Sequence, residues 1–388
     1  MSVGLEIKKK RTELGMSRKE LRDALGMELD GNRTIMMWEE GKLIPDADTL
    51  KQIQNFASCR PYSVEKPESQ DTFRYIDLFA GIGGIRIPFQ ELGGICVFTS
   101  EWDKFSQKTY QANFNVIPKG DITKIPSTDI PDFDILLGGF PCQPFSRAGL
   151  HKGFDDTRGT LFFEIERILR EKRPKAFLLE NVKQLKGHDN GRTFKVIMEH
   201  LDSLNYHTEA KVLSAIDFGV PQNRERIYIV GFDREFFRIP LEYRFPFPEP
   251  TGEKTRLGDI LEENPGPRYT ISDKLWEGHK RRKEKHRESG NGFGYCLFNE
   301  DSEYTTTISA RYYKDGSDAL IEQKGKNPRK LTPRECARLQ GFPEDFIIPV
   351  SNTQAYKQFG NSVAVPVIRA IARNMVSEIK RMEKHSDD

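Results

Sequence analysis

YIDLFAGIGGIR, from Tyr75 to Arg86, joins a short hydrophobic strand to an amphipathic helix through a turn with glycines at 81, 83 and 84. Glycine lets the backbone approach a ligand, and the amino terminus of the following helix offers N–H groups to an anion. The nicotinamide fingerprint GxGxxG is incomplete, because the residue three after Gly83 is Arg86. The pattern predicts a strand, a ligand-binding turn and a helix, with a plain tight turn as the alternative.

A carboxylate follows the next predicted strand. Glu101 lies in CVFTSEWDK, roughly 20 residues after the glycine turn, which is the spacing expected of an acid that holds a ribose diol. Together the turn and the acid indicate a nucleoside-containing cofactor. A nicotinamide-dependent oxidoreductase shares both features and stays an alternative at this point.

The segment GGFPCQPFSRAG, Gly138 to Gly149, holds Cys142 between two prolines. The apolar run 133–137 before it predicts a buried parallel strand, so that Cys142 follows the carboxyl end of a strand, where open α/β sheets have their active sites. A free cysteine is often a buried packing residue, which is the alternative. The flanks favour an exposed nucleophile, and an oxidoreductase does not explain this segment.

Composition bounds the class of protein. The chain of 388 residues is long enough for two or more domains, and its five cysteines are scattered without a CxxC pair, which favours reduced thiols over disulfides or zinc. The amino terminus lacks a signal-peptide pattern and no apolar run is long enough to span a bilayer, so we expect a cytoplasmic protein. A net charge of +2 leaves any nucleic-acid contact to local basic patches.

Three parts are predicted along the chain. Residues 1–58 alternate short helical patterns with turns, and Ser17 and Glu20 form a capping box before one helix. Residues 59–72 are polar and contain prolines, which is typical of a linker. Residues 73–232 alternate strands with helices, which predicts a mostly parallel, doubly wound α/β sheet. Residues 233–328 are irregular and include HKRRKEKHR at 279–287, a basic patch that contacts phosphate or is a solvated helix face.

The ordered motifs resemble those of bacterial restriction-modification DNA (cytosine-5)-methyltransferases. They are DLFAGIGG, SEWD, GDIT, GFPCQPFS, DDTRGTLFFEI, LLENV, QNRERIY, LTPRECARLQGFP and QFGNSV. The resemblance covers the chain from Tyr75 to the last helix except for residues 230–325. It implies an S-adenosylmethionine-dependent, Rossmann-like catalytic domain at 73–232, a target-recognition domain at 233–328, and a segment at 329–388 whose last helix packs on the sheet and completes the catalytic domain.

The chemistry of the family requires a base to be flipped out of the duplex, because the C6 atom of cytosine is hidden there. A thiolate that adds to C6 makes C5 nucleophilic, and Cys142 matches this nucleophile. By the same resemblance Glu180 of LLENV donates a proton to N3, which requires a raised pKa. Arg224 and Arg226 of QNRERIY hold the O2 atom of the base and orient the carboxylate.

The resemblance also assigns the S-adenosylmethionine site, and no metal. Phe79 and the turn of Gly81, Gly83 and Gly84 surround the methionyl end, and Asn361 closes that side. The remaining contacts are Glu101 on the ribose, and Trp102, Asp121, Ile122 and Leu161 around the adenine.

The amino-terminal pattern MSRKELRDALGM and WEEGKLIPDADTL resembles a phage-repressor-type helix-turn-helix domain. It places Arg18, Lys19, Asn32 and Arg33 where such domains meet DNA, with a dimerisation bundle as the alternative. We therefore expect duplex DNA in a cleft between the lobes, a separate operator DNA on residues 1–58, and a functional partner endonuclease. A tRNA cytosine-5 methyltransferase and a regulator on an inactive scaffold stay alternatives. Residues 305–321 are most like those of enzymes that read GC-rich sites beginning CC.

Overall fold

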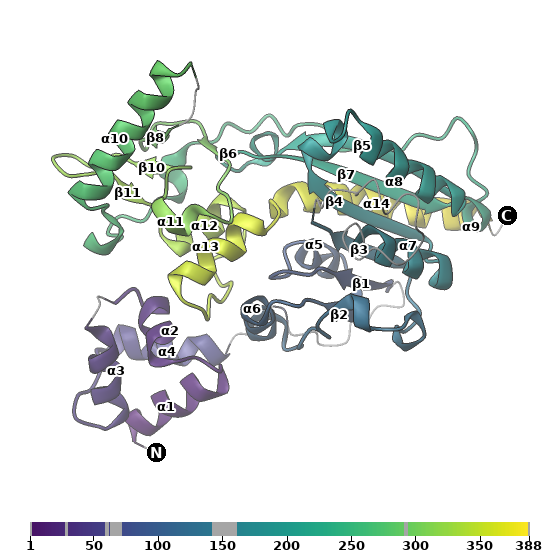
Figure 1. The fold of residues 1–388 in the computed structure, drawn as a ribbon. Helices are drawn as coiled ribbons and strands as arrows, with labels where there is room; N and C mark the ends of the chain where they lie inside the picture. The colour runs from purple at the N-terminus through teal and green to yellow at the C-terminus, as the bar shows by residue number, and fades with distance from the viewer. Residues whose placement is uncertain are drawn as a thin grey trace.

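The structure is a computed structural model, which shows a bundle of amino-terminal helices, an α/β lobe and a smaller lobe (Figure 1). The described residues are 2–27, 30–58, 62, 72–141, 161–290 and 294–386. Among the described helices, none combines the length and the apolar character that a membrane crossing requires.

The α/β lobe is built on a mixed sheet that has six strands within the described residues. In sheet order these are β2 (Ile95–Ser100), β1 (Arg74–Leu78), β3 (Ile135–Gly139), β4 (Ala176–Val182), β7 (Glu225–Asp233) and β5 (Tyr206–Ser214). The first four pair in parallel, whereas β7 runs antiparallel to both of its neighbours. The predicted α/β fold with a mostly parallel sheet is confirmed.

Helices cover both faces of this sheet. Successive side chains of a strand point to opposite faces, so neighbouring residues of one strand pack against different helices. Tyr75 of β1 packs with α5 (Arg86–Glu91) and α14 (Val365–Ser386) on one face. Ile76 packs with α7 (Leu161–Lys172) and α8 (Arg192–Ser203) on the other. Burial on both faces explains the nearly continuous apolar sequence of the strands. It also brings the last helix back to the first strand, as the resemblance implies.

The smaller lobe combines short strands and helices that lie between residues 222 and 361, apart from β7 and the short helix after it, which belong to the α/β lobe. Its strands are β6 (Gln222–Asn223), β8 (Leu297–Phe298), β9 (Thr305–Thr306), β10 (Leu320–Ile321) and β11 (Arg329–Lys330). Its helices are α10 (Asp273–Glu288), α11 (Tyr312–Asp315), α12 (Pro333–Leu339) and α13 (Asn352–Asn361). β11 follows the predicted boundary at 328 but pairs with β10, so that the smaller lobe continues across that boundary. The predicted domain limits stay predictions.

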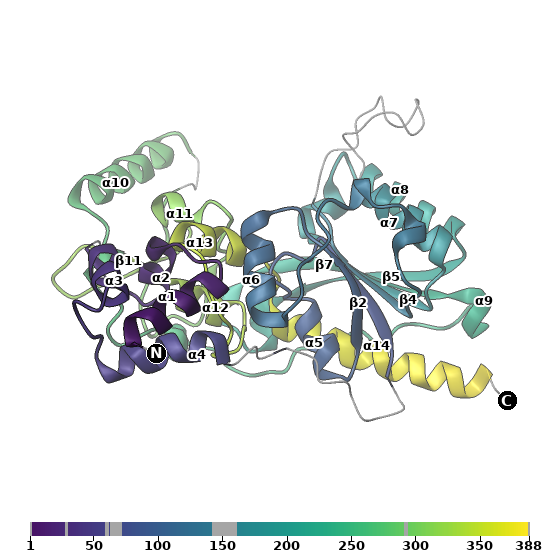
Figure 2. The same ribbon diagram turned by 90° about the horizontal axis from the view of Figure 1, so that it is seen from below.

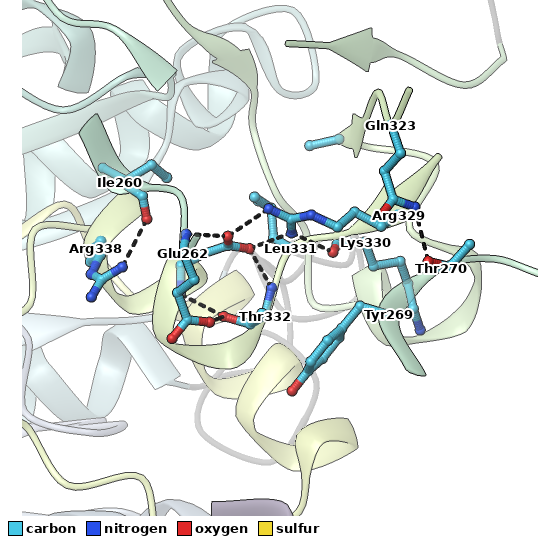
Figure 3. A network of polar contacts seen from close by, with 12 residues as sticks. Ile260, Glu262, Tyr269, Thr270, Gln323, Arg329, Lys330, Leu331, Thr332 and Arg338 are labelled. Carbon is cyan, nitrogen blue, oxygen red and sulfur yellow. Dashed lines mark hydrogen bonds and ion pairs between the residues drawn. The ribbon is translucent and has the colours of Figure 1, made fainter. Parts of the chain in front are cut away.

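A buried ion pair holds the smaller lobe together (Figure 3). The guanidinium of Arg329 donates two hydrogen bonds of 2.7 Å to the carboxylate of Glu335. That carboxylate also accepts the N–H groups of Glu262 and Thr332, at 2.8 and 2.7 Å. Each oxygen of the Glu335 carboxylate therefore accepts two hydrogen bonds, and a buried carboxylate requires its lone pairs to be satisfied in this way. The contacts tie the loop at 262, β11 and the start of α12 into one unit.

The two lobes share an apolar core. Ile82 of the glycine turn and Phe114 of α6 (Lys104–Phe114) pack in one cluster with Phe342 and with Phe359 of α13. α13 therefore faces the turn after β1 and α6, and it belongs to the wall of the site described below. The remaining short helix of the α/β lobe, α9 (Arg234–Phe237), follows β7 directly.

The amino-terminal helices are α1 (Val3–Glu13), α2 (Arg18–Ala24), α3 (Gly31–Glu39) and α4 (Ala47–Ser58). The predicted capping box is confirmed, because Ser17 Oγ accepts the N–H of Glu20 and Glu20 accepts the N–H of Ser17. The bundle has its own small core of Ile7, Leu21, Ile35, Trp38 and Ile53.

This bundle docks on both lobes (Figures 1 and 2). Lys108 of α6 lies 2.9 Å from the carboxylate of Glu20. From the smaller lobe, Arg268 donates to the carbonyl oxygen of Met27 at 2.6 Å and lies 3.8 Å from Asp23. These contacts join α2 and the segment that follows it to the rest of the protein.

Candidate active site

A cavity of about 850 Å³ opens at the carboxyl ends of the parallel strands. The segments that directly follow β1, β2 and β3 line it together with the last residues of β4, and α13 closes it from the smaller lobe. This is the place at which open α/β sheets bind ligands. The predicted site residues on its wall are Phe79, Gly81, Gly84, Glu101, Trp102, Asp121, Ile122, Leu161, Glu180, Arg224, Arg226 and Asn361.

The glycine turn is fastened by the predicted acid. Glu101 is 8% exposed, and its carboxylate accepts the N–H of Gly81 and the N–H of Asp103, each at 2.8 Å. Burial raises the pKa of Glu101, and the two N–H groups oppose that rise. Glu101 thus joins the turn after β1 to the end of β2 and leaves an acceptor at the cavity wall.

Two glycines of the turn have different surroundings. A Cβ atom on Gly83, whose φ is +86°, would lie 2.2 Å from the ring of Phe114. Gly83 is not among the residues that line the cavity, so the structure gives it a packing role and its cofactor contact stays a prediction. A Cβ atom on Gly84 would lie 2.9 Å from Ser362 Oγ, so that this glycine permits the close approach of the segment after α13.

Residues that follow β2, together with Asp121, Ile122, Leu161 and Asn361, form the rest of the predicted cofactor wall. Trp102 is 78% exposed, and Asp121 caps the 3₁₀ turn Ile122–Lys124 by accepting the N–H of Thr123. The Thr123 hydroxyl also donates to Asp121 at 2.8 Å and lowers the pKa of its carboxyl. The wall thus offers an aromatic surface and an ionised acceptor close together, which suits a nucleoside.

A buried acid and an arginine face each other at the sheet edge. Glu180 near the end of β4 is 8% exposed, and its Oε1 lies 3.1 Å from Nε of Arg226 on β7. Burial raises the pKa of Glu180, although Arg226 and Arg224 oppose the rise. A carboxyl group with a raised pKa retains its proton closer to neutral pH, as a general acid requires.

Arg224 has a different environment from Arg226. It is 2% exposed and donates to the carbonyl oxygens of Ile308 and Gly360, at 3.2 and 3.1 Å, and to that of Ser362. These acceptors come from segments far apart in the sequence. Arg224 therefore holds the smaller lobe and the end of α13 against the start of β7, which positions the cavity wall. Its predicted contact with the base stays a prediction.

Cys142 lies outside the described residues. The two residues before it, Phe140 and Pro141, line the cavity. The amide of Asn181, next to Glu180, donates to the carbonyl oxygen of Phe140 at 2.8 Å. The approach to the predicted nucleophile is thereby tied to the strand that carries the acid. Asn181 was quoted only as part of the ENV motif, and its contact with Phe140, the residue after β3, depends on strand pairing that a single sequence does not show.

A buried polar network below the glycine turn was not predicted. Asp77 of β1 is 1% exposed and accepts the hydroxyl of Tyr110 at 3.1 Å, which in turn accepts from Arg86 at 3.1 Å. Burial raises the pKa of Asp77 to about 7. The signal in the sequence is an aspartate inside an apolar strand, since buried charges require partners.

Three side chains of α13 also reach the cavity without having been assigned a role. Gln354, Lys357 and Gln358 all line it, and the hydroxyl of Thr109 on α6 donates to Gln358 at 2.9 Å. Gln358 stands in the quoted motif QFGNSV. The hydrogen bond between Thr109 and Gln358 thus joins the two lobes directly at the wall of the site.

A mostly parallel sheet with one reversed strand, a glycine turn, an acid that anchors the turn and a buried acid–arginine pair at one edge define an α/β enzyme of the methyltransferase class. Residues 73–377 match the model of the family described as C-5 cytosine-specific DNA methylase. The chain belongs to this family, and it is a DNA (cytosine-5) methyltransferase.

Similar proteins agree with this assignment. The chain is 59% identical over 383 residues to the Type II methyltransferase M1.ScrFI of Lactococcus lactis subsp. cremoris. The matched residues make up 98% of this chain and 97% of that relative. It is 59% identical to M.SsoII of Shigella sonnei over 380 residues, with 97% and 99% coverage. M.NlaX of Neisseria lactamica is 63% identical over 306 residues, which make up 78% of this chain and 96% of that relative.

Solved structures share the fold. The Entamoeba histolytica methyltransferase EhMeth superposes with a TM-score of 0.64 at 21% identity and covers 80% of this chain and 99% of its own. The S. pombe Dnmt2 methyltransferase has the same TM-score at 21% identity, with 79% and 99% coverage.

Proposed function

We propose that this methyltransferase modifies cytosine C5 at a specific duplex site with S-adenosylmethionine, through a flipped base and a covalent bond between Cys142 and C6. The observation that carries the proposal is the single cavity in which the Glu101-anchored turn and the buried Glu180–Arg226 pair meet. One end suits a nucleoside and the other suits a base that needs a proton.

The residues of the cavity fit S-adenosylmethionine. Glu101 would accept the ribose hydroxyls and Trp102 would face the adenine. Gly81, where a Cβ atom would meet nothing within 4 Å, leaves room for the methionyl end. When bound, S-adenosylmethionine supplies an electrophilic methyl group on a positively charged sulfur. Glu101 retains free lone pairs for this role, because its two backbone partners use only part of its capacity.

The residues of the chain prepare the cytosine. When the thiolate of Cys142 adds to C6, the π pair of the C5–C6 bond forms a C4–C5 double bond and the π pair of the C4–N3 bond moves to N3, which takes a proton from Glu180. The enamine that results is nucleophilic at C5, and its C4–C5 π pair forms the new carbon–carbon bond. Loss of the C5 proton to solvent, return of the N3 proton to the Glu180 carboxylate and expulsion of the thiolate restore the aromatic ring. Arg226 fixes the Glu180 carboxyl and stabilises the carboxylate that remains after proton transfer.

Methylation of this kind would protect DNA from a partner endonuclease, which the Type II names of the relatives support. We also propose that residues 1–58 bind an operator and regulate transcription. Exposed Lys19 and Arg33 at the starts of α2 and α3 support this second function, whereas Arg18 is engaged with Glu39 at 2.8 Å.

Deamination-based sequencing of DNA from cells that express the chain tests the proposed reaction, since it reports the modified base and its context. Duplexes with 5-fluorocytosine at the target should trap the protein covalently, because fluorine cannot leave C5 as a proton. Cys142→Ser should abolish transfer and trapping while cofactor binding persists. Normal transfer by this variant, or methylation of RNA and not of duplex DNA, would contradict the proposal.

A further inference from the structure

The helix α10 projects from the outer end of the smaller lobe (Figures 1 and 2). Two contacts anchor its first half. The rings of Trp276 and Tyr295 meet edge to face with their centroids 4.7 Å apart. His279 is 1% exposed, and its Nε2 lies 3.1 Å from the carbonyl oxygen of Asp315. From Lys280 to Gly290 no residue is buried. The second half is thus an exposed, strongly basic arm.

The cations of this helix fall into two groups. Four have acidic or aromatic partners within the protein. They are Lys280 with Glu277, Arg282 with Asp315, Lys283 over the Tyr295 ring, and Arg287 with Glu284. The other three, Lys274, Arg281 and Lys285, are exposed, and within the described part of the chain none of their side chains has a hydrogen bond or an ion pair.

Helical geometry places these three cations in one line. Their spacing of seven and four residues puts them on one face of an α-helix, turned away from buried His279. Gly278 lies on the same line, and a Cβ atom there would meet nothing within 4 Å. A glycine inside a helix lowers stability by roughly 1 kcal/mol relative to alanine. Since a side chain at position 278 would meet no other part of the described protein, packing does not explain why glycine is present there. We call Lys274, Gly278, Arg281 and Lys285 the cationic stripe.

From this geometry we propose that the cationic stripe binds the phosphate backbone of the substrate duplex beside the target site, independently of sequence. The stripe extends over about 16 Å, since a helix rises 1.5 Å per residue, and this matches about five phosphates along one DNA strand. Three unpaired cations in a row fit a polyanion, and the gap at Gly278 lets a backbone approach the helix. The inference rests on the proposed duplex substrate.

The arm is connected to the active site through packed elements. Arg282 of α10 binds Asp315 of α11 at 3.0 Å, and Tyr312 of α11 packs against Tyr356 of α13. α13 lines the cavity through Lys357 and Asn361. A duplex held on the stripe is therefore held relative to the wall of the catalytic cavity.

The test compares the full chain with a triple variant, Lys274→Gln, Arg281→Gln and Lys285→Gln. The matched control is Arg373→Gln, Lys380→Gln and Lys384→Gln on α14, which has the same spacing, the same charge change and exposed positions. Equilibrium binding is measured over a range of salt, on a duplex that extends well beyond the target and on one that ends close to it. Lys274→Arg with Lys285→Arg retains the charges.

We expect the stripe variant to lower the slope of log affinity against log salt by about 3 on the long duplex, with little change on the short one. The charge-retaining variant and the α14 control should behave as the wild type does. Equal slopes for wild type and stripe variant, or an equal loss in the α14 control, would overturn the proposal and leave the stripe to a partner other than DNA. Because binding is read without methyl transfer, failure of the proposed reaction is seen separately, as absence of methylation by the wild type.

Discussion

Arg226 Nε lies 3.1 Å from Glu180 Oε1, across a pair of antiparallel strands. The direction of β7 explains this contact. Because β7 runs opposite to β4, its first residues lie at the edge where β4 ends, and Val182 pairs with Arg226. A single reversed strand thus brings arginines to the carboxyl edge of an otherwise parallel region, where the cavity opens.

Replacement of the buried acid tests its chemical role. Glu180→Gln preserves the shape of the side chain but removes the acidic proton, so the methylation rate should fall about 10²- to 10⁴-fold, as expected for a positioned general acid. Single-turnover methyl transfer and DNA affinity should be measured together. If both fall by the same factor, Glu180 positions the base and does not transfer a proton.

The arginine should set the pH range of activity. Arg226 lowers the pKa of Glu180 against the effect of burial, so Arg226→Gln should raise that pKa further. Since activity requires protonated Glu180, the falling limb of the rate at high pH should move to higher pH in this variant, at a reduced maximal rate. A pH profile under single-turnover conditions measures this shift. If the fall in rate at high pH occurs at the same pH in the variant, a group other than Glu180 causes it.

Glu101 should control cofactor binding. Glu101→Gln weakens the charge-assisted hydrogen bonds from Gly81 and Asp103, and hydrogen bonds to charged groups contribute roughly 1.5–3 kcal/mol. The dissociation constant for S-adenosylmethionine should rise about tenfold to a hundredfold. Calorimetric titration provides the value. Glu171→Gln, an exposed change on α7, is the matched control and should bind as the wild type does.

Asp77 should make stability depend on pH. Its pKa is about 7 in the folded protein against an ordinary 3.8, so its contribution to stability is present at low pH and is lost as the pH rises toward 7. Between pH 5 and 8 the wild type should lose about 3 kcal/mol relative to Asp77→Asn. Urea unfolding at several pH values tests this difference, and parallel curves for the two proteins would show that Asp77 does not titrate in that range.

The parts of the fold that the sequence predicts are those with strong local signals. β1 to β4 and β7 are continuous apolar runs, and the Ser17–Glu20 capping box has a local pattern. β5 was not predicted, because its sequence YHTEAKVLS is polar and most of its side chains are half-buried at the edge of the sheet. An edge strand of this kind is defined by pairing with β7 more than by its own hydrophobicity.

Contacts between distant segments could not be predicted. Most site residues were found by motif and lie on one cavity wall, but the bonds of Arg224 to carbonyl oxygens at 308 and 360 depend on tertiary structure. The same holds for the amino-terminal helices. The proline-containing linker suggests an independent domain, yet Lys108 and Arg268 bind it through charges that look like ordinary surface residues in the sequence.

Removal of the amino-terminal helices should leave sequence-specific methylation largely intact. The cofactor wall, Glu180 and the smaller lobe all follow residue 72, and the family model matches residues 73–377. Deletion of residues 1–70 exposes Lys108 and Arg268, and loss of the partly buried ion pair from Lys108 should cost about 1 kcal/mol of stability. Deamination-based sequencing with thermal unfolding of both forms measures the two effects.

Repression should instead require the amino-terminal helices. Exposed Lys19 and Arg33 should contact the operator, so Lys19→Gln with Arg33→Gln in the full chain should abolish repression of a promoter reporter while methylation persists. Lys51→Gln, an exposed change on α4, should leave both functions unchanged. Operator affinity should fall steeply as salt rises, because phosphate contacts dominate such binding. Equal repression by the full and truncated chains, or loss of methylation on truncation, would assign these helices to catalysis or assembly.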